Sequence, residues 1–254
     1  MTLNFHEYGS GRPLIILHGL FGSLDNWHTL SKAFGASYRV FAIDQRNHGR
    51  SPHSDVFSYE AMSEDLKGFL DDHHLTAAHV LGHSMGGKTA MQFALSYPER
   101  VDKLIVVDIA PRAYSPLHDE IFDALLSLDL SRYSSRQEVE AALATKIPDF
   151  AVRQFVMKNL DRDESGAFRW KMNLAAIHRN YGEIANAIES NHPFAKPTLF
   201  VQSTRSGYIR DSDVPHIRQL FPQSQVVRIE AGHWIDAEAP QEFSRVVLDF
   251  LGNP

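Results

Sequence analysis

The feature that most limits the fold of this chain is a series of short apolar runs that alternate with segments of helical spacing. Six runs are rich in β-branched residues, nearly continuous and too short to form helices, as expected for strands covered on both faces. They span residues 13–19, 38–44, 78–84, 103–111, 196–203 and 225–233. As an alternative to residues 13–19, the first strand is a seventh run, residues 3–9, which would pair antiparallel at one edge. This alternation predicts a mostly parallel α/β sheet with helices on both faces.

Two of the intervening segments carry the apolar stripe of an amphipathic helix. In residues 58–74 the stripe consists of Met62, Leu66, Phe69 and Leu70. The last helix is expected to begin near Pro240. Its stripe consists of Phe243, Val246, Val247, Phe250 and Leu251. Each stripe predicts one helix face that packs against the sheet.

The alternation stops once, between Pro111 and Lys196, where the sequence has helical spacing and no strand signal. The apolar residues of three expected helices are Ile121, Phe122, Leu125 and Leu126, then Phe155, Val156 and Leu160, then Leu174 and Ile177. We interpret residues 112–190 as a helical cap on a core of residues 1–111 and 191–254. Ligands bind at the carboxyl edge of an open parallel sheet, so an insertion there would cover the site. A plain helical extension is the alternative.

Composition and charge exclude several classes of protein. The 31 acidic and 25 basic residues leave a formal charge of −6 and are scattered along the chain, which is unlike a nucleic-acid-binding surface. No cysteine is present, so disulfides, thiolate metal sites and a cysteine nucleophile are excluded. The histidines and carboxylates show no convincing metal spacing. We therefore expect no metal, no cofactor and no nucleic-acid partner.

The sequence also bears on location. The first residues, MTLNFHEYGSGRP, lack the basic flank and the apolar centre of a signal peptide. No apolar run approaches the about 18 residues that a membrane-spanning helix needs. We expect a soluble cytoplasmic protein with no membrane span.

The stretch VLGHSMGGKTA, residues 80–90, places Ser84 between a predicted strand and a predicted helix. This is the context of a nucleophile elbow, in which a sharp turn lifts the serine hydroxyl clear of the sheet. Gly82 and Gly86 then have a steric role, because the chain passes too close to itself there for side chains. The alternative is a glycine turn without chemistry. We interpret Ser84 as the nucleophile of an acyl-transfer reaction.

Two further motifs supply what a serine nucleophile needs. The stretch LHGLFGS, residues 17–23, follows the first apolar strand and is expected to give a backbone N–H donor to an oxyanion, with Leu20 as our choice. The second donor is the N–H of Met85, at the start of the helix after Ser84. The general base is His233, which follows a glycine at the end of the last strand. His18 is expected to hold its loop by hydrogen bonds. We expect surface or packing roles for His73, His74, His118, His178 and His216.

Together these motifs resemble the α/β-hydrolase superfamily, in the chain order serine, acid, histidine. The stretches HGLFGSLDNW, DQRNHGRSP, GHSMGGKTAM and VVDIAPRAY are more closely similar to YbfF-type bacterial esterases and their mitochondrial abhydrolase relatives. The expected fold is therefore the α/β-hydrolase fold: a mostly parallel eight-stranded sheet, helices on both faces, and a helical cap inserted after the sixth strand. The resemblance implies a cofactor-free serine esterase or thioesterase that acts on short to medium acyl groups.

The acid of the triad has two candidates. Most relatives place it in the loop after the seventh strand, but the matching position here is Ser206, and Asp211 lies further along in what reads as a capped helix start. Asp108 ends the strand that follows the nucleophile helix, and it should point at the same crevice. An unpaired aspartate in that apolar run would cost several kcal/mol, and a histidine N–H is a suitable partner. We favour Asp108 and keep Asp211 as the alternative.

The predicted function is hydrolysis of small-molecule carboxylic esters or thioesters through a serine acyl-enzyme. A carbon–carbon bond hydrolase, a perhydrolase or a lyase with the same triad remains an alternative, because a fold does not determine a reaction. A low-turnover ligand-binding receptor that keeps the triad is another. We expect Asp44 and Arg46, in the turn after the second apolar strand, to be structural.

Overall fold

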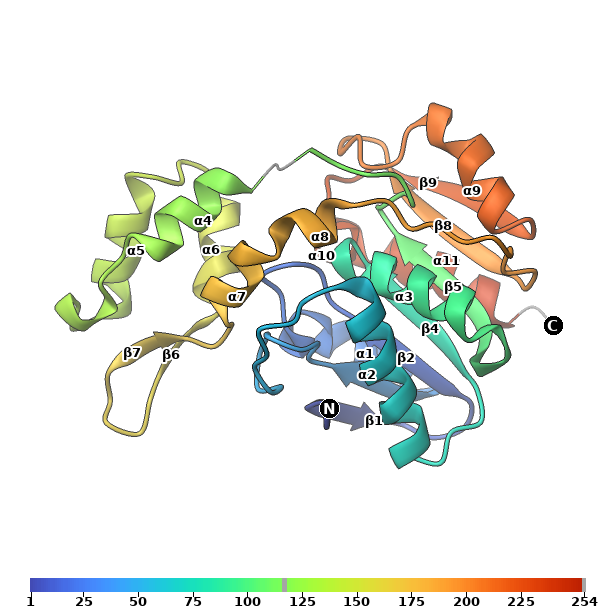
Figure 1. The fold of residues 1–254 in the computed structure, drawn as a ribbon, viewed down its shortest axis with the longest axis horizontal. Coiled ribbons are helices and arrows are strands. Elements are labelled where there is room, and N and C mark those ends of the chain that lie inside the picture. The colour runs from blue at the N-terminus through green and yellow to red at the C-terminus, as the bar shows by residue number, and fades with distance from the viewer. Residues whose placement is uncertain (116–117, 253–254) are drawn as a thin grey trace.

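A computed structural model describes residues 1–115 and 118–252. Its main sheet has the strand order β1-β3-β2-β4-β5-β8-β9, in which β1 is antiparallel to β3 and all other pairs are parallel (Figure 1). The strands are β1 (Phe5–Tyr8), β2 (Pro13–Leu17), β3 (Arg39–Ile43), β4 (Ala78–His83), β5 (Val101–Val107), β8 (Thr198–Ser203) and β9 (Ser224–Ile229). All seven apolar runs thus form the predicted strands, including the antiparallel edge strand.

The sheet has seven described strands where we expected eight, and the large insertion follows the fifth strand of the chain, not the sixth. The difference has a simple origin. Seven strands correspond to apolar runs, whereas the eighth rests only on the family pattern, and residues 1–4 form no strand.

Helices cover both faces of the sheet because its strands are apolar on both sides. Successive strand residues such as Ile15 and Ile16 are both fully buried, yet they belong to two different hydrophobic cores. One core lies under α2 (Tyr59–Asp72), α3 (Met85–Ser96) and α9 (Val214–Leu220), and the other under α1 (His28–Phe34) and α11 (Pro240–Gly252). The predicted stripes of α2 and α11 face these cores, with Val246 only partly buried. Short elements complete this part: η1 (Leu24–Trp27), η2 (Pro98–Arg100), η4 (Asp211–Asp213) and α10 (Ile235–Glu238).

The insertion between β5 and β8 lies beyond the carboxyl ends of the parallel strands, on the left of Figure 1. Its described elements are α4 (Asp119–Leu126), η3 (Leu130–Arg132), α5 (Arg136–Ala144), α6 (Phe150–Met157), β6 (Leu160–Arg162), β7 (Phe168–Trp170), α7 (Leu174–Arg179) and α8 (Tyr181–Ala185). The antiparallel pair β6–β7 corrects our expectation of helices alone. Three-residue strands are too short to produce a readable alternation, and Asp163 and Gly166 close the turn between them.

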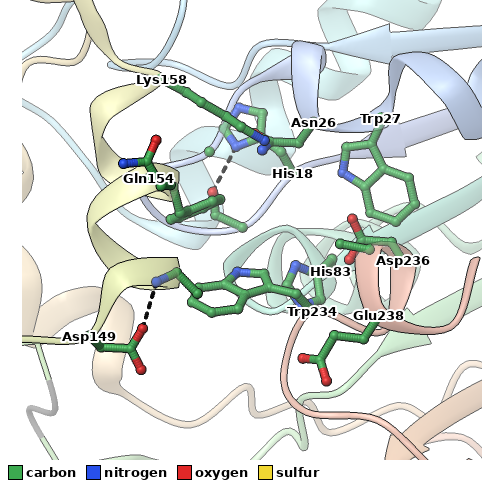
Figure 2. Close-up of a pocket in the computed structure, with 15 residues that line it drawn as sticks. His18, Asn26, Trp27, His83, Asp149, Gln154, Lys158, Trp234, Asp236 and Glu238 are labelled. Atoms are coloured by element: carbon green, nitrogen blue, oxygen red, sulfur yellow. Dashed lines mark hydrogen bonds between the residues drawn. The ribbon is translucent and has the colours of Figure 1, made fainter. Parts of the chain in front are cut away.

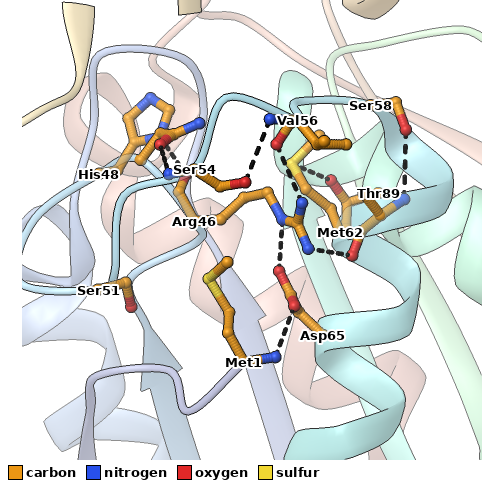
Figure 3. A network of polar contacts seen from close by, with 12 residues as sticks. Met1, Arg46, His48, Ser51, Ser54, Val56, Ser58, Met62, Asp65 and Thr89 are labelled. Atoms are coloured by element: carbon orange, nitrogen blue, oxygen red, sulfur yellow. Dashed lines mark hydrogen bonds and ion pairs between the residues drawn. The ribbon is translucent and has the colours of Figure 1, made fainter. Parts of the chain in front are cut away.

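The turn after β3 is held by buried charges, as expected for Asp44 and Arg46. The Arg46 guanidinium forms an ion pair with Asp65 of α2 at 2.5 Å and donates to the carbonyl oxygens of Val56 and Ala61 (Figure 3). The Asp44 carboxylate accepts hydrogen bonds from backbone N–H groups, including that of Leu24 at 2.8 Å. Both residues therefore tie loops to the sheet. Within the described part of the chain, no helix combines the length and apolar character that crossing a bilayer requires.

Candidate active site

Ser84 lies at a strained turn between β4 and α3. Its φ and ψ are 54° and −118°, a region that non-glycine residues rarely occupy. The Ser84 N–H donates to the carbonyl oxygen of Val107 at 3.0 Å, which holds the turn against β5. A Cβ on Gly82 would lie 2.1 Å from the Gly86 oxygen, and one on Gly86 would lie 2.4 Å from the Leu17 oxygen. The predicted steric role of both glycines is confirmed.

His233 and Asp108 are in contact although 125 positions separate them in sequence. His233 Nδ1 lies 2.8 Å from Asp108 Oδ2, and the Asp108 side chain is fully buried. The other carboxylate oxygen of Asp108 accepts a hydrogen bond from the Ser203 N–H at 3.0 Å. Because the carboxylate accepts from Nδ1–H, the other ring nitrogen, Nε2, is left as the basic atom of a neutral imidazole.

The alternative acid, Asp211, lies elsewhere. Its side chain is 79% exposed and forms an ion pair with Arg228. Asp213 accepts a hydrogen bond from the Arg210 N–H at 2.8 Å, so the aspartate that caps this turn is Asp213. Of the two candidates, only Asp108 contacts His233.

Aromatic rings enclose the imidazole of His233. Tyr208 stacks on it with ring centroids 4.1 Å apart and an interplanar angle of 23°. On another side, His83 Nε2–H donates to the His233 carbonyl oxygen at 2.8 Å. Burial, followed by the neighbouring His233, lowers the pKa of His83 to about 3, so its ring is neutral and suited to that bond. Tyr208 stands in a loop without any motif, so no sequence signal pointed to it.

The loop after β2 presents Leu20 beside Ser84. The Gly22 N–H donates to the Gly19 oxygen at 3.0 Å, and Phe21 has a φ of 59°, so residues 19–22 form a tight turn with Leu20 at its second position. Met85 is the first residue of α3, where a backbone N–H has no partner within the helix. Leu20 and Met85 therefore lie on the two segments that flank Ser84.

Two buried side chains hold this loop in place. His18 Nδ1–H donates to the Gly19 oxygen at 2.8 Å, and its Nε2 accepts from the Gln45 N–H at 3.1 Å, which confirms the predicted role of His18. Burial lowers the pKa of His18, in keeping with a neutral ring. From the insertion, Asn159 Nδ2 donates to the Phe21 oxygen at 2.6 Å. No sequence signal pointed to Asn159.

Three cavities adjoin this arrangement. Ser84 and His233 line a cavity of about 200 Å³, whose apolar walls include Ile121, Val152 and Phe155 of the insertion. A second, of about 50 Å³, lies between Ser84 and Lys88. Both are also lined by His118, whose Nδ1 bonds the Tyr181 hydroxyl, so this histidine is part of the site and not merely packing.

The largest of these three cavities, of about 530 Å³, lies on the far side of a Phe155–Trp234 pair whose ring centroids are 5.3 Å apart. Both of these residues line it and the Ser84 cavity alike. Figure 2 shows its polar groups, with Lys158 of the insertion facing Asn26 and with Asp236 beside Trp27. Burial raises the pKa of Asp236 to about 6.

Comparison with known proteins shows the family of the chain. Residues 12–240 match the family described as alpha/beta hydrolase fold. The chain is 38% identical to the sn-1-specific diacylglycerol lipase ABHD11 of Danio rerio, covering 97% of this chain and 80% of that protein. It is 34% identical to esterase YbfF of Escherichia coli, covering 95% and 93%. A solved structure titled "Marine microorganism esterase" superposes with a TM-score of 0.96 at 45% identity, covering 98% of both chains. The chain belongs to the α/β-hydrolase fold family and is of its esterase and lipase type.

Proposed function

We propose that the chain hydrolyses carboxylic esters or thioesters of short to medium acyl groups through an acyl-enzyme on Ser84. The observation that carries this proposal is the contact between His233 Nδ1 and Asp108 Oδ2 at 2.8 Å, beside a cavity that Ser84 and His233 both line. A serine hydroxyl needs a base at neutral pH, and an imidazole oriented by a carboxylate is suited to that task.

In the proposed reaction, His233 Nε2 takes the proton of the Ser84 hydroxyl as its oxygen attacks the substrate carbonyl. The resulting oxyanion accepts hydrogen bonds from the N–H groups of Leu20 and Met85, each worth about 3 kcal/mol. The buried Asp108 carboxylate stabilises the imidazolium. His233 then returns the proton to the departing alcohol or thiol. Water, activated by His233, attacks the acyl-enzyme, and the acid leaves.

The size of the cavity at Ser84 supports a short to medium acyl group. Its volume of about 200 Å³ is below the range of roughly 300–1,000 Å³ typical of sites for drug-sized ligands. The insertion contributes Ile121, Val152 and Phe155 to its wall. The proposed cap of residues 112–190, on a core of residues 1–111 and 191–254, would therefore select substrates. A cytoplasmic location stays a prediction.

The test is to label Ser84 covalently. A fluorophosphonate probe should label the wild-type protein and fail to label Ser84→Ala, and hydrolysis of p-nitrophenyl butyrate should fall by about 10⁶-fold in kcat. Circular dichroism should show the same fold in both proteins, because the substitution leaves the glycines of the turn untouched. Labelling of the variant at another serine would overturn the assignment. Cleavage of a vinylogous diketone without ester hydrolysis would indicate a carbon–carbon hydrolase instead.

A further inference from the structure

A buried lysine lies one helical turn beyond Ser84. Lys88 is on α3, is only 1% exposed, and lines the cavity of about 50 Å³ that also touches Ser84. Residues four positions apart lie on the same face of a helix, so Lys88 follows Ser84 along the face that borders the cavity. The proposed hydrolysis assigns no role to this lysine.

The partners of Lys88 compensate its charge only in part. Its Nζ donates to the Asn186 carbonyl oxygen at 2.5 Å and lies 4.9 Å from the ring centre of Tyr114 and 5.7 Å from that of Tyr59. Among the described ion pairs, none joins Lys88 to a carboxylate. Burial, followed by the nearby Arg112, lowers the pKa of Lys88 to about 7. An ammonium group removed from water is costly unless an anion accompanies it.

Three tyrosine hydroxyls at this cavity are already engaged. The Tyr59 hydroxyl donates to the Ile184 oxygen at 2.8 Å, and the Tyr114 hydroxyl donates to the Tyr208 oxygen at 2.6 Å. The Tyr181 hydroxyl bonds His118. An ammonium has three donors, and one carbonyl oxygen accounts for one of them. Lys88 is therefore the strongest donor that a ligand in this cavity could meet.

We propose that Lys88 binds a carboxylate at the far end of the acyl group, so that half-esters or half-thioesters of short dicarboxylic acids are the preferred substrates. This rests on the proposed function of Ser84 and specifies its acyl substrate. The cavity has room for a small polar group but not for a long hydrocarbon chain. If Lys88 were purely structural, it would only have to join α3 to the segment after α8 by a hydrogen bond. An uncharged donor could form such a bond.

The experiment compares two esters of nearly equal shape. Monomethyl succinate carries a carboxylate where methyl 4-methylpentanoate carries an isopropyl group, and methanol release is measured for both, with the monomethyl esters of glutarate and adipate added to vary the length. Wild type should prefer at least one half-ester in kcat/KM. Lys88→Met should lower the ratio of anionic to neutral ester by on the order of 10- to 100-fold, the worth of one charged hydrogen bond.

Lys103→Met provides the matched control. Lys103 is also buried and donates to the helix-end carbonyl oxygens of Phe250 and Leu251, but it does not line the cavity. Its replacement should lower the thermal midpoint and leave the ratio of the two esters at the wild-type value. An equal loss on both esters in Lys88→Met, or no preference for any half-ester in wild type, would overturn the proposal. If wild type released methanol from none of the esters, neutral ones included, the proposed function itself would be overturned.

Discussion

The carboxyl edge of the sheet and the insertion line the same cavities, yet they are built differently. The sheet edge is made from buried strands, and its loops are held by buried hydrogen bonds such as those of His18. The insertion consists of short helices and the two short strands β6 and β7, and it leaves large apolar side chains in solvent, with Phe150 64% and Leu126 44% exposed. Short, exposed elements adapt at lower cost than a closely packed core. The candidate catalytic residues therefore lie on the rigid part, whereas the apolar wall comes from both parts, with Ile121, Val152 and Phe155 supplied by the adaptable one.

Backbone strain follows the same division. Phe21, Ser84 and Asp108, which all border the site, have positive φ values and are not glycines. In the described part of the insertion, the residue with positive φ is Gly166, at a hairpin turn that carries no strain for glycine. Strain concentrates where the surrounding structure holds the chain firmly enough to keep it.

The largest effect expected from a single conservative change is at the acid. Asp108→Asn keeps the shape of the side chain, but its amide favours the wrong tautomer of His233 and cannot stabilise the imidazolium. The same change in a serine protease costs about 10⁴ in rate. Asp211→Asn should remain near wild type, because Asp211 pairs only with an exposed arginine. Both are compared by kcat on p-nitrophenyl butyrate, with thermal melting recorded. A crippled Asp211→Asn beside an active Asp108→Asn would refute our assignment.

A matched pair of helical glycines tests the difference in rigidity. Gly86→Ala places a methyl group 2.4 Å from a backbone oxygen and should cost roughly 3 kcal/mol or more. Gly182 of α8 is exposed, and a methyl group at this position would have no atom within 4 Å, so Gly182→Ala should gain up to about 1 kcal/mol. Denaturant unfolding measures both. If both variants lost equal stability, the contrast between rigid core and adaptable insertion would be wrong.

Mild acid should destabilise the rigid core through its buried histidines. Burial lowers the pKa of His48 and of His83 to about 3, below the value of about 6.5 in an unfolded chain. The unfolded chain then binds more protons as the pH falls below 6.5, so stability present above that pH is lost. Each histidine should account for about 1.6 kcal/mol between pH 6.5 and 5.

Denaturant unfolding of His48→Gln at the two pH values checks this. Between pH 6.5 and pH 5, the free energy of unfolding of the variant should fall less than that of wild type. The difference should equal the contribution of one histidine. His178→Gln, a change at an exposed histidine of the insertion, serves as control and should keep the wild-type loss. Identical losses in all three proteins would contradict the prediction.

The smallest effect concerns a hydrogen bond from the insertion to the loop after β2. Asn159→Ala removes the donor to the Phe21 oxygen and should let the turn of Leu20 shift, which would lower kcat by about 10-fold while KM changes little. Asn180→Ala removes another contact from the insertion to the core, the bond of Asn180 Nδ2 to the Asp55 oxygen at 3.0 Å. Because Asp55 lies outside the turn of residues 19–22, this variant should keep kcat. Equal kcat in both variants would show that Asn159 does not position the loop.

The sequence alone was sufficient for features that depend on near neighbours. The seven strands, the apolar stripes of α2 and α11, and the glycines around Ser84 all reflect side-chain periodicity or steric limits within a few residues. Prediction failed for β6 and β7, which are too short for periodicity, and for an eighth strand that no apolar run supported.

Only the tertiary structure decided which distant groups meet. Asp108 and Asp211 were both plausible partners of His233, and the contact at 2.8 Å depends on the order of β5, β8 and β9 in the sheet. The bond of Asn159 to the loop of Phe21 and the enclosure of Lys88 by Tyr59 and Tyr114 likewise join segments far apart in sequence. Such contacts arise from the path of the whole chain, and a local pattern carries no information about that path.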